Sequence, residues 1–191
     1  NVKKMENKIK NVCVIGGGAA GLMAAYAAAE NGHTVTLFEQ NEKLGKKIYI
    51  TGKGRCNFTN DCSLDEFFSN IVRGERFLKG SLYAFTPQDT IQFFENNGLS
   101  VKIERGNRAF PQSDHASDVT KTLEKACKIM GVEVKLGEKA TDLLCTTPNI
   151  IPMSDIEQGC TPGIIAMPRI AGLRTEKGEY ACDVVIVATG G

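Results

Sequence analysis

The sequence predicts an α/β protein with a central parallel sheet, flanking helices and a small antiparallel β excursion. Three observations carry this prediction. Residues 11–39 show a strand pattern, a helix pattern and a second strand pattern in immediate succession. Residues 184–187 form a short run of β-branched residues, which is typical of a parallel strand buried on both faces. Strand and helix patterns also alternate between these two regions, as they do in Rossmann-like folds.

The composition is that of an ordinary globular protein. The 191 residues suffice for one sizeable domain, and 42% hydrophobic with 24% charged residues exclude wholesale disorder, collagen-like repeats and a coiled coil. The net charge of +1 gives no overall field favouring nucleic acid or an anionic membrane, so neither is an expected partner. The seven cysteines include no C-x-x-C pair, so we expect reduced thiols and no metal site. No targeting segment is visible, and we expect a cytoplasmic protein.

The first 40 residues contain a complete strand–helix–strand unit. Residues 11–16 are an apolar run ending in glycine, which indicates a buried strand. Residues 19–31 are rich in alanine and favour a helix, which Gly32 ends. A second β-branched strand follows at residues 34–38, with Glu39 at its end. This is the order of elements in a dinucleotide-binding crossover.

The turn at residues 16–21 fits the pattern G-x-G-x-x-G. Gly16 permits the tight turn, Gly18 lets the backbone approach a pyrophosphate, and Gly21 lets the helix lie close to the strand. Amides at the start of the helix, at the positive end of its dipole, attract phosphates. The residues expected at the phosphates are Gly16, Gly18, Ala19, Ala20 and Gly21. A lone glycine turn is often purely structural, whereas a turn in register with a strand, a helix and an acid favours a binding site.

Glu39 lies about 20 residues after the turn, where an acid accepts hydrogen bonds from a ribose hydroxyl pair. Its negative charge disfavours a 2′-phosphate, which argues against NADP at this position. The turn and the acid together do not distinguish FAD from NAD.

Residues 40–60 form a second glycine-rich stretch, predicted as a loop. Its cations are interleaved with glycines and include Lys43, Lys46, Lys47, Lys53 and Arg55. Backbone amides beside glycines can turn toward an anion, so this stretch is a candidate anion site. The alternative is a solvated basic loop, which composition alone favours. The spacing excludes a phosphate-binding loop of the type G-x-x-x-x-G-K-[ST].

The middle of the chain alternates helix and strand patterns. Residues 65–80 predict an irregular helix whose aromatic side chains belong to the core. Thr86 and Pro87 are typical of a helix start, and that helix runs to about Asn97. A short strand is expected at residues 101–104. The apolar and aromatic set expected in these helices is Phe67, Phe68, Ile71, Phe77, Ile91, Phe93 and Phe94.

The next segment predicts a further strand–helix–strand step. Residues 109–113 are expected to be a loop, and Ser113 or Asp114 caps a helix from about His115 to Met130. A strand at residues 132–136 follows. His115 is a weak catalytic candidate, because a single histidine near a helix start is usually a surface residue.

The last third predicts the antiparallel excursion and a final parallel strand. Strands at residues 140–146 and 163–174 flank a polar stretch at 147–162, interpreted as a flexible insertion. A hairpin turn is expected at residues 176–179. The strand at 184–187 is followed by Ala188, Thr189, Gly190 and Gly191, whose glycines permit a ligand at the carboxyl edge of the sheet.

Four sequence motifs identify a family. The segment ITGKGRCNFTN is preceded by GGGAAGLMAA and followed by RAFPQSDHASDV and ATGG. In this order they closely resemble the BaiN/RdsA-type NAD(P)/FAD-dependent oxidoreductases. The resemblance implies FAD as the cofactor, with its AMP half on the first unit, and places Arg108 and Ser113 near the active site. It also places Gly54, Arg55, Cys56, Asn57 and Thr59 toward the flavin or substrate face.

The resemblance implies an FAD-dependent oxidoreductase that passes a hydride between a small organic substrate and flavin, with NAD(P)H as a candidate co-substrate. The family includes reductases of conjugated enones and amine oxidases, so the direction of electron flow is open. The resemblance also implies that residues 1–191 are an incomplete FAD-binding domain, without the substrate domain and C-terminal return segment of related flavoproteins. Two alternatives are a non-catalytic dinucleotide-binding module and an NAD-dependent dehydrogenase.

The predicted site contains cofactor-binding residues but no assigned general acid or base. The candidates are Gly16, Gly18, Ala19, Ala20, Gly21, Glu39, Gln40, Lys47, Gly54, Arg55, Cys56, Asn57, Ala140, Ala188, Thr189 and Gly190. Cys56 raises the alternative of a redox-active thiol beside the flavin. Its nearest neighbour, Cys62, is one residue too far for C-x-x-x-x-C, and no local base lowers its pKa, so packing or hydrogen bonding is the favoured role.

Overall fold

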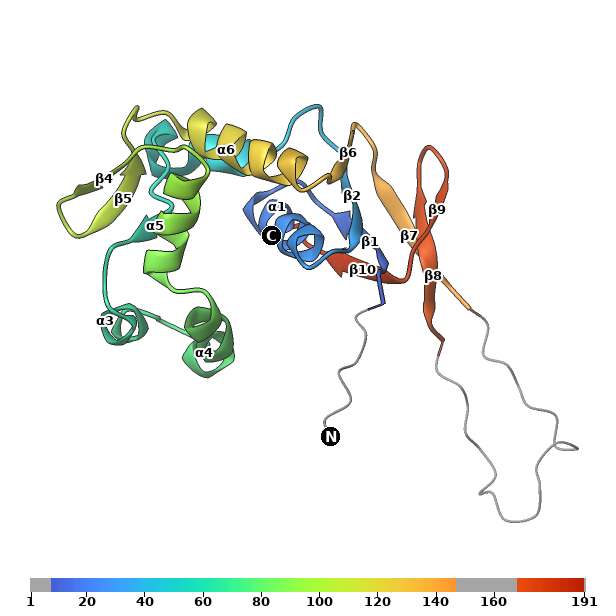
Figure 1. Cartoon of the computed structure of the whole chain (residues 1–191), viewed down its shortest axis with the longest axis horizontal. Helices are drawn as coiled ribbons and strands as arrows, with labels where there is room; N and C mark the ends of the chain where they lie inside the picture. Colours follow the sequence, from blue (N-terminus) through green and yellow to red (C-terminus); the bar gives the residue numbers. More distant parts are fainter. Residues whose placement is uncertain (1–7, 147–167, 191) are drawn as a thin grey trace, which may run out of the picture.

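The computed structural model describes residues 8–146 and 168–190. Its centre is a four-stranded parallel sheet in the order β10-β1-β2-β6 (Figure 1). The strands are β1 (Asn11–Ile15), β2 (Thr34–Glu39), β6 (Glu133–Leu136) and β10 (Val184–Val187). The predicted α/β fold with a central parallel sheet is therefore confirmed. In the part described, no helix combines the length and the apolar character needed to cross a membrane.

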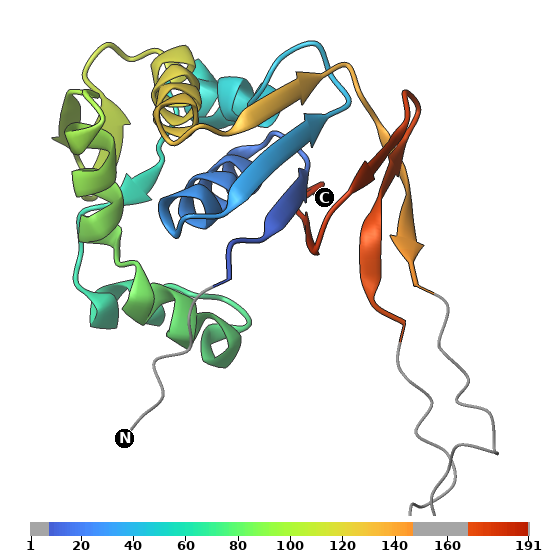
Figure 2. The same cartoon turned by 45° about the vertical axis from the view of Figure 1, so that its right-hand side comes forward.

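The two faces of the sheet are covered differently, and the alternation of side chains along the strands determines which residues face each layer. Val14 and Leu37 are fully buried against the helices α1 (Ala19–Glu30) and α6 (Ala116–Ile129). Their neighbours Cys13 and Phe38 point to the opposite face, where they pack with Leu173. Helices thus cover one face and the antiparallel excursion lies on the other (Figure 2).

The excursion is a three-stranded antiparallel sheet in the order β7-β8-β9. Its strands are β7 (Ala140–Cys145), β8 (Ile170–Thr175) and β9 (Glu179–Ala181). The predicted hairpin turn is present, because the Thr175 amide donates to the Gly178 carbonyl at 2.8 Å. Residues 147–162, interpreted from the sequence as an insertion, lie outside the described residues.

A second small sheet, β3-β5-β4, lies beside the helical layer. It contains β3 (Thr59–Asn60), β4 (Val101–Glu104) and β5 (Arg108–Pro111). The expectation of a loop at residues 109–113 was wrong for its first part, because β5 pairs along the whole of β4. The helix α5 (Pro87–Asn96) packs against this sheet and starts as predicted. Thr86 and Asp89 form a reciprocal capping box at its first turn.

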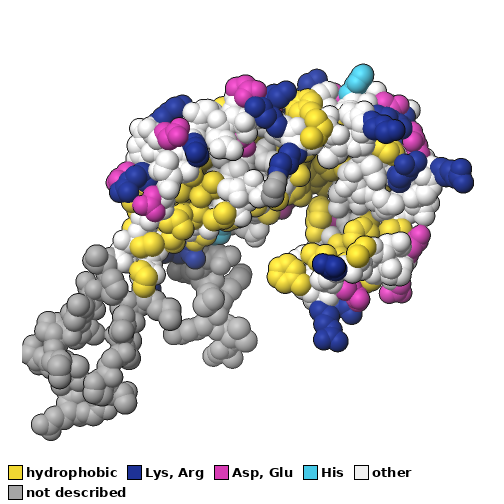
Figure 3. Space-filling model, turned by 180° about the vertical axis from the view of Figure 1, so that it is seen from behind, with side chains coloured by type: hydrophobic (Ala, Val, Ile, Leu, Met, Phe, Trp, Pro, Cys, Tyr) yellow, Lys and Arg dark blue, Asp and Glu magenta, His cyan; other side chains and the backbone are white. Residues whose placement is uncertain are grey.

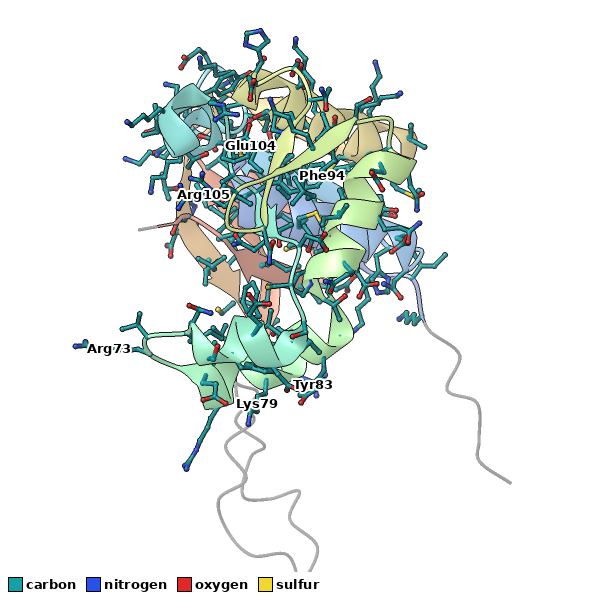
Figure 4. All side chains as sticks on the ribbon, turned by 90° about the vertical axis from the view of Figure 1, so that its left-hand side faces the viewer. Arg73, Lys79, Tyr83, Phe94, Glu104 and Arg105 are labelled. Carbon is teal, nitrogen blue, oxygen red and sulfur yellow. The ribbon has the colours of Figure 1, made fainter. Side chains whose placement is uncertain are left out.

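The segment predicted as one irregular helix is two helices, α3 (Leu64–Ser69) and α4 (Glu75–Ala84), separated by a turn in which Gly74 has φ 81°. The expectation that its aromatic residues belong to the core was wrong, since neither helix contains a buried residue and Phe77 is 88% exposed. The two helices pack on each other through Phe68 and Tyr83 and project from the rest of the molecule (Figures 3 and 4). Phe93 and Phe94 of α5 are core residues, as predicted.

Two further expectations need correction. The cap residue of α6 is His115, whose side chain makes no capping bond; the Ser113 hydroxyl accepts from the His115 amide at 3.3 Å. The strand β10 is not fully buried, because Val184, Val185 and Ile186 are half-buried and Val187 is 64% exposed. Among the described residues, β10 pairs only with β1, so its second edge has no neighbouring strand.

Candidate functional site

Four segments meet at the carboxyl edge of the parallel sheet, where ligands bind in open α/β folds. They are the glycine turn after β1, the end of β2, the start of the short helix α2 (Lys46–Ile50), and the turn after β10. Three main-chain hydrogen bonds join them: Gly16 N to Phe38 O at 2.8 Å, Gly45 N to Gly17 O at 2.8 Å, and Ala188 N to Ile15 O at 2.9 Å. The sequence had predicted this edge as the ligand site.

Glycine is needed at three positions of the turn for two different reasons. A Cβ atom on Gly16 would lie 2.4 Å from the Ala188 oxygen, and one on Gly21 would lie 1.8 Å from the Gly16 oxygen. Gly16 also has φ 106°. The fold itself therefore requires these two glycines. A Cβ on Gly18, in contrast, would meet no atom within 4 Å. The open space beside Gly18 leaves its backbone accessible to a ligand.

The start of α1 is suited to an anion. Gly18 is the cap residue, no side chain caps this end, and no acidic residue lies in the first turn. The first amides of a helix have no partner inside the helix, and they carry the positive end of its dipole. Ala19 and Ala20 leave these amides uncovered by long side chains. This arrangement matches a diphosphate-binding turn.

Glu39 lies at the end of β2 with only 8% of its surface exposed. Its Oε2 atom accepts from the Gly17 amide at 2.7 Å, and its Oε1 atom accepts from the Asn41 amide at 2.8 Å. The carboxylate is therefore fixed beside the glycine turn. The Asn41 side-chain amide also donates to Oε1, so Oε2 keeps the lone pair with which the carboxylate can accept a hydrogen bond from a ribose hydroxyl. Gln40, the neighbouring candidate, is exposed.

The predicted candidates Lys47 and Gly190 lie together although they are far apart in the sequence. A Cβ atom on Gly190 would lie 3.2 Å from Lys47 Nζ. Thr189 adjoins the first turn, since its Cα atom would be 3.2 Å from a Cβ on Gly16. These contacts bring the turn after β10, the first glycine turn and α2 into one site.

Ala140 is the first residue of β7, in a segment that is hydrogen-bonded to Glu39. The Glu138 amide, two residues earlier, donates to the Glu39 carbonyl at 2.9 Å. Ala140 itself packs against the cluster that contains Phe38 and Cys182. The position of Ala140 is therefore adjacent to the residues expected at the ribose.

A second group of candidates follows α2 directly, in the 3-10 turn η1 (Thr51–Gly54) and the residues after it. The Asn57 side-chain amide donates to the Ala109 carbonyl at 3.0 Å, which attaches this segment to β5. Cys56 is buried at 5% exposure, and burial raises the pKa of its thiol. The neutral thiol is not a nucleophile, so this environment favours the packing role over a redox role. Arg55 is ion-paired with Glu104 and Asp114.

Arg108 and Ser113 are engaged in local contacts. Arg108 Nε donates to the Arg105 carbonyl at 3.0 Å, and the Ser113 hydroxyl donates to Asp118 at 2.7 Å. Ser113 lines a cavity of about 520 Å³ between the end of α5 and the start of α6. Among the described residues, no hydrogen bond or ion pair joins Arg108 or Ser113 to the glycine turn, and their role on the flavin side stays a prediction.

Sequence reasoning missed two residues that shape the site. Asn41 holds the Glu39 carboxylate, and Gly45, with φ 67°, begins α2 and donates to the glycine turn. A Cβ on Gly45 would lie 2.6 Å from a Thr120 side-chain atom, so glycine is required there. The signal available in the sequence was an asparagine two residues after the acid and a glycine before a pair of lysines.

The fold and this site define a dinucleotide-binding Rossmann domain. The family model for the HI0933-like protein Rossmann domain matches residues 10–191, and the chain belongs to this family. This is a family of FAD-dependent oxidoreductases, and FAD is the cofactor of its Rossmann domain. The resemblance noted from the four motifs is thereby confirmed.

Curated relatives are longer than this chain. The 3-dehydro-bile acid delta(4,6)-reductase of Clostridium scindens is 34% identical over 151 residues, 77% of this chain and 36% of that protein. The ribosomal RNA dihydrouridine synthase of Haemophilus influenzae is 27% identical over 179 residues, 93% of this chain and 39% of that protein. The chain thus spans less than two fifths of the length of either relative.

A solved structure has the same fold. The 3-ketosteroid-delta4-(5alpha)-dehydrogenase from Rhodococcus jostii RHA1 aligns with a TM-score of 0.62 and 15% identity, covering 99% of this chain and 47% of that one. At this identity the likeness concerns the fold alone.

Proposed function

We propose that residues 1–191 bind FAD for a reductase that adds hydride and a proton across a carbon–carbon double bond conjugated with a carbonyl group. One observation carries the binding part of the proposal: an uncapped helix start with open space at Gly18 lies beside the fixed carboxylate of Glu39. When bound and reduced by NADH or NADPH, the flavin would supply the hydride for such a reduction. The protein residues bind the diphosphate, hold the ribose and orient the cofactor.

The substrate class rests on chemistry shared by the two relatives. The name of one describes reduction of a dehydro bile acid, and the name of the other describes formation of dihydrouridine. In both reactions a double bond conjugated with a carbonyl becomes saturated. We propose the small-molecule substrate for this protein, because its net charge of +1 gives no overall electrostatic attraction for RNA. NADH or NADPH is the proposed source of electrons.

The proposal assigns only the FAD site to the described residues. It assigns no residue of the chain to substrate binding or to sheltering of the flavin ring. The cytoplasm is the proposed location, since cysteines without an obvious disulfide framework fit a reducing compartment. No residue of the chain is proposed as general acid or base.

The first test is the visible absorption spectrum of the purified chain after incubation with FAD and gel filtration. We expect a yellow protein with stoichiometric flavin. A colourless protein that NADH stabilises against heat would instead support an NAD-dependent dehydrogenase and overturn the FAD assignment. The second test is turnover: the FAD-loaded protein should oxidise NADH or NADPH when an α,β-unsaturated ketone is present. Bound flavin without any turnover would support a non-catalytic module, and turnover only with a uridine-containing RNA would overturn the small-molecule assignment.

A further inference from the structure

Residues 52–57, between α2 and the second sheet, have an unusual backbone. Gly52, Lys53, Gly54 and Cys56 have positive φ angles of 55°, 56°, 87° and 59°. For lysine and cysteine this left-handed conformation is unfavourable, because the Cβ atom comes close to a carbonyl oxygen. Such a conformation persists only when surrounding contacts determine it. The contacts that hold this loop are therefore part of the site.

Arg55 provides the charged contacts of the loop. Its Nε atom donates to Asp114 Oδ1 at 2.7 Å, and its Nη2 atom is hydrogen-bonded to Glu104 Oε1. The guanidinium carbon also lies 4.4 Å from the centre of the Phe110 ring. The edge of the guanidinium thus pairs with the two carboxylates and its face stacks on the Phe110 ring. These groups belong to the β4–β5 hairpin and the turn after it, and together they fix the orientation of the guanidinium.

Lys102 completes a group of four charges, the Arg55 cluster, which consists of Arg55, Lys102, Glu104 and Asp114. Lys102 and Glu104 are two residues apart on β4 and so share one face of the strand. Lys102 Nζ lies 2.6 Å from Asp114 Oδ2 and 3.4 Å from Glu104 Oε1. The two positive and two negative charges balance, and each carboxylate has both cations as partners. Glu104 is the last residue of β4 and is labelled in Figure 4.

We propose that Arg55 is a positioning residue: through the Arg55 cluster it holds the left-handed loop 52–57 on the β4–β5 hairpin and so sets the backbone on the flavin side of the FAD site. The inference rests on the proposed function, because it takes this loop as the flavin side. It differs from the expectation that Arg55 itself contacts the flavin. A guanidinium that is already paired twice and stacked on a ring acts through the loop that carries it.

The loop itself can be observed without cofactor, by hydrogen–deuterium exchange of the apoprotein. The Cys56 amide donates to Thr51 O at 3.1 Å, and the Phe58 amide donates to Ala109 O at 3.2 Å, so both are expected to be protected. Arg55→Gln, and separately the double variant Glu104→Gln/Asp114→Asn, should raise exchange at these two amides about tenfold, the size of a typical coupling between contacting residues. The control is Arg73→Gln, an exposed arginine in the turn between α3 and α4 (Figure 4).

Exchange at the β1 amides distinguishes local release from unfolding, because it should not change in any of these variants. Equal exchange at Cys56 and Phe58 in Arg55→Gln and in the wild type would overturn the proposal. So would a rise of equal size at β1, since it would show global destabilisation rather than positioning of the loop.

FAD affinity then distinguishes positioning from direct contact. If Arg55 acts through the cluster, Arg55→Gln and Glu104→Gln/Asp114→Asn weaken FAD binding to a similar extent, about tenfold, and the triple variant is no weaker than either. A loss in Arg55→Gln alone would show direct contact and overturn the proposal. If the wild type binds no FAD, the proposed function fails, whereas the exchange experiment still decides whether Arg55 holds the loop.

Discussion

Replacing Gly18 and Gly21 separately with alanine should separate ligand binding from folding. A Cβ atom on Gly18 meets no atom within 4 Å, and the backbone there is extended, with φ −81° and ψ −173°, which alanine adopts readily. Alanine is a poorer helix cap than glycine but restricts the unfolded chain, so Gly18→Ala should cost about 1 kcal/mol or less. For a chain of this size, that lowers the melting temperature by about 2–4 °C at most.

Gly21→Ala adds the same methyl group but should destabilise the fold much more than Gly18→Ala. Its Cβ would lie 1.8 Å from the Gly16 oxygen, so the main chain of the turn has to move. We expect a cost of about 3 kcal/mol or more, at the upper end of overpacking, and a melting temperature lower by about 6–12 °C.

For FAD binding by the folded protein, the order should be the reverse: Gly18→Ala should have a larger effect than Gly21→Ala. The new methyl group of Gly18→Ala occupies the space through which a diphosphate approaches the amides. The clash between this methyl group and the diphosphate should weaken FAD binding by about 1–3 kcal/mol, or roughly 5- to 150-fold. A titration followed by flavin fluorescence measures the affinity. Thermal melting by circular dichroism of the apoproteins provides the folding control. Unchanged FAD affinity in Gly18→Ala, with melting close to that of the wild type, would refute the assignment of the diphosphate to this turn.

Three other predictions concern the acid, the α5 cap and the pH dependence. Glu39→Gln should weaken FAD binding about tenfold in the same titration. The reason is that one of the two carboxylate oxygens, each of which accepts from a backbone amide, is replaced by an NH₂ group that faces an N–H donor. Equal affinity would contradict the assignment of Glu39 to the ribose. Thr86→Ala should lower stability by about 1 kcal/mol in urea unfolding and leave FAD affinity unchanged, because it removes only the reciprocal cap with Asp89; a loss of affinity would contradict the placement of α5 outside the site. The pKa of Glu104 is lowered mainly by a hydrogen bond from Arg55, and that of Asp114 mainly by one from Lys102. A carboxyl with a lowered pKa stabilises the fold above its unfolded pKa and loses that contribution as pH falls. The melting temperature should therefore drop as pH falls below about 4, and less steeply in Glu104→Gln/Asp114→Asn; parallel profiles would contradict this.

The opening unit could be predicted from the sequence because each of its signals is local. The two strands and the helix were expected within one residue of β1, α1 and β2. The glycines and the acid needed only their spacing from each other. The capping pair at Thr86 and Pro87 is equally local, and α5 begins where it indicates.

The elements that sequence reasoning missed depend on contacts between distant residues. The helix α2 has glycines on both sides and two lysines, which suggest a loop, yet Ile48 is buried in the core and Gly45 fixes its start. The strand β5 contains Pro111 and is kept extended by pairing with β4. The reverse error occurred at Phe77, where an apolar residue in a helix was expected to be buried but lies on a projecting helix pair.

The same distinction applies to the site. Glu39 and the glycine turn are close in sequence, whereas Arg55 and Asp114 are 59 positions apart, and no pattern in either segment indicates the other. Lys47 and Gly190 likewise meet only after folding, because parallel strands bring their carboxyl ends to one edge. The sequence thus predicted which residues serve the cofactor, and the fold shows which of the predicted residues contact one another.

A crystal structure of the protein grown with FAD tests the central claim most directly. We predict phosphate oxygens at about 3 Å from main-chain amides at the start of α1, and a ribose hydroxyl donating to Glu39. FAD bound elsewhere on the molecule, or bound with its diphosphate away from Gly18, would contradict the account.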